Sequence, residues 1–259
     1  MPRFNRKRGV YLLLFLTFHG AAVTFANGVE SQNVVGYQTK TLTNIGYNFF
    51  TPTFKNVSGQ AINLQDIVPV GAMGDQSEFI MKLDEDGLAT DESYCWMTVD
   101  GCGAPYGDGW YNGDTWELIE GVTIADGEGL YFYCPNDVSI SFTFSGAVDF
   151  AEKEVALKNQ GYNIVGNASP VDVDLQSITM TDAMGDQSEF IVMYDEDGLA
   201  TENIYCWMTV DGCGAPEGDG WYNGDTWEKI QGVTIYAGDA MMVYSPNTSS
   251  AKIKFPEIN

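Results

Sequence analysis

The sequence predicts an all-β protein that consists of two tandem antiparallel β-sandwich or jelly-roll-like domains. Three observations indicate this fold class. The chain contains a long internal repeat, its apolar segments are short and rich in β-branched and aromatic residues, and Gly, Asp, Asn and Pro cluster between them at intervals of about ten residues. No window of helical length shows an apolar period typical of a helix.

The internal repeat divides the chain into two similar parts. The segment AMGDQSEFI begins at Ala72 and again at Ala183, an offset of 111 residues that holds through the whole central part of the repeat. A period of this length indicates duplication of a complete domain and not a solenoid of short repeats. A recent duplication would explain the near-identity of the central part without any functional constraint. The predicted domains are residues 27–146 and residues 147–259.

The strands are expected where short apolar segments lie between turn residues. In the first copy they are predicted at residues 34–42, 79–83, 94–99, 129–134 and 138–144. The last of these alternates apolar side chains with Ser and Thr, which predicts one buried and one exposed face. Hairpin turns are expected at 85–87 and 196–198, and short helical turns at 62–68 and 173–179.

The N-terminus has the pattern of a secretory signal peptide. Basic residues are followed by an apolar run at 10–18 and by small residues up to Ala26, so we expect cleavage after Ala26 and a secreted, extracellular or cell-surface protein. An uncleaved N-terminal anchor is the alternative. Residues 1–26 hold every arginine and the one histidine, so the exported chain keeps eight lysines against 36 acidic residues, a formal net charge of −28.

This composition excludes several classes of function for the exported chain. Ser/His/Asp and Cys/His nucleophile systems need an imidazole, and so do histidine zinc sites. Bidentate capture of phosphate needs a guanidinium. The strong negative charge repels nucleic acid and anionic lipid, so no nucleic-acid partner and no membrane insertion are expected. Polysaccharide or a second copy of the chain remains as a partner.

The cysteines predict disulfide bonds in an exported protein. Cys95 and Cys102 are close in the first copy, and Cys206 and Cys213 repeat the spacing, so one local disulfide per copy is expected to stabilise the fold by roughly 2 to 3 kcal/mol. Zinc bound by all four, with the copies facing each other, is the alternative. The fifth cysteine, Cys134, is expected to be buried or to form an intermolecular bond.

Acidic hairpins suggest a calcium site, because calcium prefers several hard oxygen ligands. An EF-hand register fails, since Lys82 or Met193 would stand at its first ligand position. A solvated hairpin turn is the alternative interpretation. The candidate ligands are Asp84, Asp86, Asp91, Asp195, Asp197 and Glu202.

Clusters of aromatic residues suggest a carbohydrate-binding surface, because sugars stack on aromatic rings. Burial of these rings in the core is the alternative, since large aromatic side chains stabilise small β domains. The candidate residues are Trp110, Tyr111, Trp116, Trp221, Tyr222 and Trp227.

The second copy resembles a known module. Its segment GYNIVGNASPVDVDL, at 161–175, is similar to tandem β-repeat secreted proteins of the Verrucomicrobia and Lentisphaerae type, as is SQNVVGY at 31–37. The first copy departs at 49–53, where FFTPT replaces IVGNA. The resemblance implies β-rich extracellular modules without assigned activity, and it supplies no catalytic residue.

These observations together predict a secreted or cell-surface structural or adhesive protein without catalytic activity. A carbohydrate-binding module that uses the Trp and Tyr clusters is the second hypothesis. A glycoside hydrolase with a pair of carboxylates is the third, because this mechanism needs neither histidine nor arginine. No cofactor other than calcium is expected.

Overall fold

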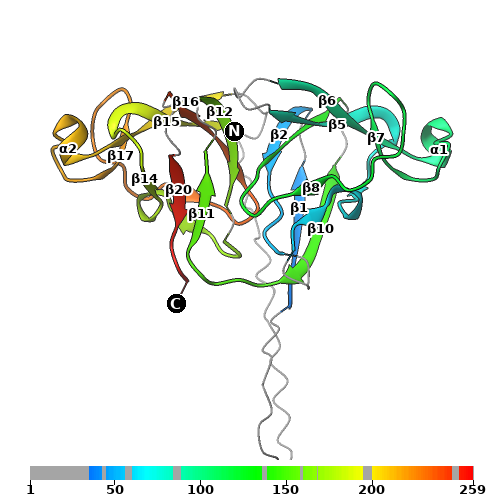
Figure 1. Ribbon diagram of the computed structural model, residues 1–259, viewed down its shortest axis with the longest axis horizontal. Helices are drawn as coiled ribbons and strands as arrows, with labels where there is room; N and C mark the ends of the chain where they lie inside the picture. Colours follow the sequence, from blue (N-terminus) through cyan, green and yellow to red (C-terminus); the bar gives the residue numbers. More distant parts are fainter. Residues whose placement is uncertain are drawn as a thin grey trace, which may run out of the picture. The chain divides into compact units, whose positions relative to one another are not determined.

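A computed structural model describes most of the chain (Figure 1). The described residues are 35–42, 45–55, 60–83, 89–135, 139–157, 160–167, 169–194, 200–246 and 251–258. The predicted signal peptide and the two predicted hairpin turns lie outside these ranges. No helix among the described residues is long and apolar enough to cross a membrane.

Each repeat builds a five-stranded antiparallel sheet. In the first repeat its spatial order is β2 (Gly46–Phe50), β9 (Leu130–Cys134), β5 (Asp75–Leu83), β6 (Ala89–Met97) and β7 (Gly109–Asn112). In the second it is β12 (Gly161–Gly166), β19 (Ala240–Ser245), β15 (Asp186–Tyr194), β16 (Ala200–Met208) and β17 (Gly220–Asn223). Pairing of β5 with β6 and of β15 with β16 is antiparallel, as the predicted hairpins require.

Smaller sheets complete each repeat. The three-stranded sheets are β1 (Val35–Leu42), β10 (Ile140–Ala147) and β4 (Pro69–Val70), and β11 (Lys153–Ala156), β20 (Lys252–Phe255) and β14 (Thr179–Thr181). The two-stranded sheets are β3 (Ile62–Asn63) with β8 (Thr123–Ile124), and β13 (Val173–Asp174) with β18 (Thr234–Ile235). All these pairings are antiparallel, so the predicted all-β fold class is confirmed.

Each repeat has its own hydrophobic core between its five-stranded and three-stranded sheets. The predicted alternation in β10 is confirmed, since Ile140, Phe142 and Phe144 are buried while Thr143 is exposed. Phe142 packs on Phe132 of β9 with ring centroids 5.1 Å apart, which joins the two sheets across the core. The second repeat has an equivalent, separate core cluster. Contacts between the repeats nevertheless make Asn33–Asn259 one compact unit.

Four short helices lie between the strands in the part of the chain that the structure describes. The expected helical turns are the 3₁₀ helices η1 (Leu64–Asp66) and η2 (Leu175–Ser177). The α-helices α1 (Val99–Cys102) and α2 (Val210–Cys213) were not predicted from the sequence. Thr98 caps α1 by accepting a hydrogen bond from Gly101 N, and Gly103 ends it with a φ of 74°. The TVDGCG segment therefore contained a capping signal that strand periodicity obscured.

The predicted disulfides are not formed. All five cysteines lie within the described ranges, and none of them takes part in a disulfide bond; they are Cys95, Cys102, Cys134, Cys206 and Cys213. Cys95 lies opposite Tyr111 in the β6–β7 ladder, whereas the Sγ of Cys102, at the end of α1, lies 3.7 Å from Thr98 O. Cys102 packs on the cluster of Met97, Ala104 and Tyr111, so α1 holds the two sulfurs at different places. The helix α1, which was not predicted, is thus the physical reason why the predicted disulfide is absent. The helix α2 has the same effect on Cys206 and Cys213 in the second copy.

Candidate functional site

Four of the six predicted carbohydrate-binding rings are buried. Trp110, Tyr111, Trp221 and Tyr222 are 0% exposed, so none of them can stack on a polysaccharide. Trp110 Nε1 donates to Ile67 O at 2.7 Å, a hydrogen bond that satisfies the indole within the core. The core interpretation is therefore correct for these four positions.

The other two predicted rings lie at the surface. Trp116 is 44% exposed and Trp227 is 47% exposed, each with a φ of 60° in the turn that follows β7 or β17. Asn112 Oδ1 accepts from Asp114 N and Thr115 N, which shapes the turn that presents Trp116. Each repeat therefore offers one exposed indole and no Trp cluster on its described surface.

A larger aromatic surface lies on the outer faces of the five-stranded sheets. Alternation along each strand puts one set of side chains into the core and the other on this outer face. Tyr47 stacks on Tyr131 with centroids 4.5 Å apart, and Phe79 stacks on Tyr133 at 4.9 Å. Equivalent rings cover the second sheet, where Phe190 stacks on Tyr244 at 4.9 Å. We name this surface the aromatic strip; its residues are Tyr47, Phe49, Phe79, Tyr131, Tyr133, Tyr162, Phe190, Tyr194 and Tyr244.

The aromatic strip continues from one repeat to the other. Phe49 of the first repeat and Tyr194 of the second lie with ring centroids 4.3 Å apart. Burial, together with the neighbouring Tyr47 and Tyr194, raises the pKa of Tyr131 to about 12. The phenol therefore stays neutral at physiological pH, and the centre of the strip carries no charge. The aromatic residues that alternate along 129–134 are the signal in the sequence that points to this surface.

The repeats contact each other through two equivalent backbone pairings. Thr51 N donates to Gly238 O at 3.1 Å, and Gly166 N donates to Gly127 O at 2.9 Å. Gly166 is the counterpart of Thr51 in the repeat alignment, and Gly127 is the counterpart of Gly238. The same patch of each repeat is thus used twice, as in the self-complementary interface of a two-fold symmetric dimer.

Glycine makes this symmetric contact possible at its centre. A Cβ added to Gly166 would overlap the side chain of Thr51, its own counterpart. A Cβ added to Gly129 would lie 2.9 Å from the Cβ of its counterpart, Ala240. Equivalent residues meet where a two-fold axis passes, so only one member of each pair can carry a side chain. This explains why the second copy has Gly166 at the position equivalent to Thr51.

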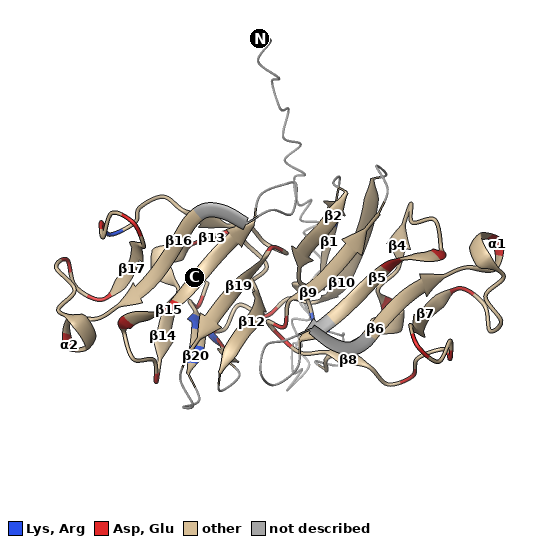
Figure 2. Cartoon of the chain, turned by 90° about the horizontal axis from the view of Figure 1, so that it is seen from above, with Lys and Arg blue, Asp and Glu red and all other residues tan. Residues whose placement is uncertain are grey.

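Comparisons with protein-family models, with curated proteins and with solved structures found no match to this chain. Figure 2 shows acidic residues at loops and strand ends in both repeats. Among the described residues, no three His, Cys, Asp or Glu side chains come together as a metal-binding group. The predicted calcium ligands Asp84, Asp86, Asp195 and Asp197, and the side chains of Asp91 and Glu202, lie outside what the structure describes.

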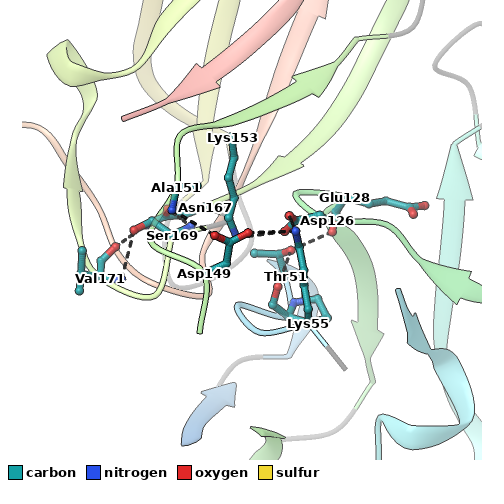
Figure 3. Close-up of polar contacts among 11 residues, drawn as sticks. Thr51, Lys55, Asp126, Glu128, Asp149, Ala151, Lys153, Asn167, Ser169 and Val171 are labelled. Atoms are coloured by element: carbon teal, nitrogen blue, oxygen red, sulfur yellow. Dashed lines mark hydrogen bonds and ion pairs between the residues drawn. The ribbon is translucent and has the colours of Figure 1, made fainter. Parts of the chain in front are cut away.

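An ion-pair cluster joins the repeats beside the backbone pairings (Figure 3). Lys55 Nζ lies 3.0 Å from Asp149 Oδ2 and 3.1 Å from Asp126 Oδ2. Lys153, which is 8% exposed, lies 3.3 Å from Asp126 and so links β11 of the second repeat to the 125–129 loop of the first. Partial burial of these charges favours pairing over hydration and gives the contact a defined register.

This cluster predicts a loss of stability in acid. The hydrogen bond from Lys55 lowers the pKa of the Asp149 carboxyl, and a hydrogen bond from Ala151 N acts in the same direction. A carboxyl whose pKa is lower in the folded than in the unfolded chain stabilises the fold at any pH above its unfolded-state pKa of about 3.9. This stabilisation is lost as the pH falls through the folded-state pKa. Lys55 has a raised pKa, so its own contribution is lost only in strong base.

We expect Asp149→Asn to be less stable than the wild type near neutral pH and to approach it as the pH falls through the lowered pKa of Asp149. Urea denaturation at a series of pH values measures the difference in the free energy of unfolding. Glu257→Gln is a control that lies outside the cluster. A difference that stays constant down to about pH 2 would contradict a role for the Asp149 charge.

Proposed function

We propose that this chain is an exported structural or adhesive protein without catalytic activity, and that the aromatic strip is its contact surface. The observation that supports this proposal is that the aromatic strip continues from one repeat to the other through the contact of Phe49 with Tyr194. Large apolar patches on a protein surface are typical of sites that contact a partner. The charge of −28 keeps the exported chain in solution until this surface is covered.

The ring geometry favours an apolar, adhesive contact. Tyr47 lies on Tyr131 with an angle of 14° between the ring planes, so these two ring faces cover each other. Tyr47 is 36% exposed and its counterpart Tyr162 is 38% exposed, which leaves apolar area that a contact would remove from water. Burial of such area supports self-association or adsorption without a requirement for charged partners.

The proposal is tested by removing the two equivalent exposed rings. We expect Tyr47→Ser/Tyr162→Ser to weaken self-association and retention on polystyrene by about tenfold, which corresponds to a loss of about 1.4 kcal/mol of apolar contact. Sedimentation velocity over a range of protein concentrations measures the first quantity, and a plate-retention assay measures the second. Trp116→Asn/Trp227→Asn, which removes exposed rings outside the strip, is the matched control and is expected to behave as the wild type.

Two results would contradict the proposal. One is a wild-type chain that stays monomeric and is not retained on the surface. The other is a strip variant that assembles and adheres as well as the wild type while its circular dichroism spectrum is unchanged.

Carbohydrate binding is the second candidate, and the exposed indoles of Trp116 and Trp227 favour it. Among the described residues no aromatic ring stacks on either indole, whereas Tyr47 and Tyr131 cover each other's ring faces. The same pair of variants separates the candidates. Binding to an insoluble polysaccharide that is lost in Trp116→Asn/Trp227→Asn and kept in Tyr47→Ser/Tyr162→Ser would favour the carbohydrate hypothesis.

A further inference from the structure

An uncharged face rich in hydroxyl groups lies on the three-stranded sheet of the first repeat. Alternation along β1 and β10 turns one set of side chains of each strand outward. Tyr37 is the most exposed of them, at 73%, and Ser and Thr side chains lie beside it. We name this surface the hydroxyl face; its residues are Tyr37, Thr39, Thr41, Ser141, Thr143 and Ser145.

Hydrogen bonds join the hydroxyls of this face. Thr39 Oγ1 and Thr143 Oγ1 lie 3.3 Å apart, and Thr41 Oγ1 and Ser141 Oγ lie 3.0 Å apart. Hydrogen bonds with Thr39 and Thr143 also lower the pKa of the Tyr37 phenol, so its hydroxyl belongs to the same array. Each hydroxyl can donate one hydrogen bond and accept two, so the array keeps both donors and acceptors for a partner.

The equivalent face of the second repeat carries ion pairs. There Glu154 pairs with Lys252 at 2.9 Å, and Glu152 pairs with Lys254 at 2.8 Å. The pairing of β11 with β20 matches that of β1 with β10, so the positions correspond one to one. In the first repeat these four positions are occupied by Thr39, Ser141, Tyr37 and Thr143.

The absence of charge decides which partner this face fits. In the described strands β1, β4 and β10 no residue is acidic, although the chain as a whole is strongly acidic (Figure 2). Lys40, the one basic residue of β1, pairs with Asp239 of the second repeat. Covering an ion pair costs the hydration of two charges, whereas a hydroxyl exchanges a hydrogen bond with water for one with the partner. The face therefore suits a partner that is uncharged and has hydroxyl groups of its own.

We propose that the hydroxyl face binds a neutral, extended polysaccharide of the β-linked glucan class. A sugar ring stacks on the exposed ring of Tyr37, and the Ser and Thr hydroxyls exchange hydrogen bonds with the sugar hydroxyls. From Tyr37 to Thr41 the strand extends about 14 Å, which accommodates a short stretch of such a chain. The threonine side chains have few rotamers, so little conformational entropy is lost on binding.

This site is separate from the aromatic strip and from the exposed indoles, and it does not rest on the proposed adhesive function. Affinity electrophoresis of the exported chain in native gels tests it, with hydroxyethyl cellulose as the probe. We expect the mobility of the wild type to fall as the polymer concentration rises. Carboxymethyl cellulose has the same backbone and a negative charge, and we expect its apparent affinity to be at least about tenfold lower because the acidic chain repels it.

Two variants test the hydroxyl groups. Thr39→Glu/Ser141→Lys copies an ion pair that already exists in the second repeat and leaves the net charge unchanged, so we expect a folded chain with an apparent affinity at least about tenfold lower. Thr39→Val/Thr143→Val keeps the shape of the side chains and removes two hydroxyls, and it is also expected to weaken binding. Glu154→Lys/Lys252→Glu, which reverses the ion pair of the other repeat, is the matched control and is expected to bind as the wild type.

The variants of the other two surfaces separate the proposals. Trp116→Asn/Trp227→Asn and Tyr47→Ser/Tyr162→Ser are both expected to keep wild-type retardation by hydroxyethyl cellulose. Loss of adhesion in Tyr47→Ser/Tyr162→Ser with intact retardation would leave the polysaccharide proposal standing, so it succeeds or fails separately from the adhesive function.

Four results would overturn the proposal. The first is a wild-type chain that hydroxyethyl cellulose does not retard, and the second is equal retardation by carboxymethyl cellulose. The third is wild-type binding by both variants of the hydroxyl face while their circular dichroism spectra are unchanged. The fourth is self-association in sedimentation velocity that Thr39→Glu/Ser141→Lys abolishes, without binding of the polymer, which would make a second copy of the chain the partner of this face.

Discussion

Replacement of Trp110 by alanine is expected to lower the free energy of unfolding by about 3 to 5 kcal/mol, the range for deletion of a fully buried large aromatic side chain. Trp110 is 0% exposed, and its ring contacts Trp96 at 5.4 Å and Phe132 at 6.5 Å between centroids. The substitution also leaves Ile67 O without the indole donor, which adds the cost of an unsatisfied buried carbonyl.

Urea denaturation followed by circular dichroism measures this effect. Trp221→Ala is expected to show a similar loss, because Trp221 Nε1 donates to Ile178 O at 2.8 Å in the same arrangement. Trp116→Asn is the control, with an expected change within about 0.5 kcal/mol, since Trp116 is exposed and asparagine tolerates a positive φ. A loss below about 1 kcal/mol for Trp110→Ala would contradict its placement in the core.

A single methyl group at Gly166 is expected to destabilise the contact between the repeats. In Gly166→Ala the new Cβ would overlap the side chain of Thr51, and overpacking of this kind costs about 1 to 3 kcal/mol. Thr51→Gly in the same chain removes the obstacle and is expected to restore most of the loss. The restored variant still lacks the hydrogen bond from Thr51 Oγ1 to Glu128 O, 2.8 Å long in the wild type.

The four chains of this double-mutant cycle are compared by urea denaturation, and the coupling energy is the quantity of interest. We expect a favourable coupling of at least about 1 kcal/mol, because the two residues meet directly. Additive losses in the double variant would show that the overlap with Thr51 is not the cause. Since the double variant places glycine at 51 and the side chain at the equivalent position 166, it also tests the two-fold relation between the repeats.

Several elements were predictable because they depend on local sequence. Alternation placed Ile140, Phe142 and Phe144 on one buried face, and the burial predicted for Cys134 is confirmed at 1% exposure. The helical turn predicted at 62–68 is present as the 3₁₀ helix η1, which Asn63 caps by accepting a hydrogen bond from Gln65 N. In each case, neighbours within a few residues decide the conformation.

The errors arose where local signals supported two outcomes. The spacing of Cys95 and Cys102 suits a disulfide in an extended loop, but the four-residue helix α1 separates the two sulfurs. Trp110 and Trp116 belong to one aromatic segment, yet Trp110 lies inside the strand β7 and Trp116 lies in the turn beyond it. Composition alone cannot separate a core ring from a surface ring that is six residues away.

The sequence by itself determined the duplication, the all-β class, the strong negative charge and the set of side chains that share a strand face. These properties follow from composition and from the two-residue period of a strand. Only the tertiary structure decided which face each sheet covers, how Thr51 meets Gly166 and how Phe49 of one repeat packs on Tyr194 of the other. The reason is that these features depend on contacts between segments about 80 to 200 residues apart, and side-chain periodicity carries no information about which distant surface a strand will meet.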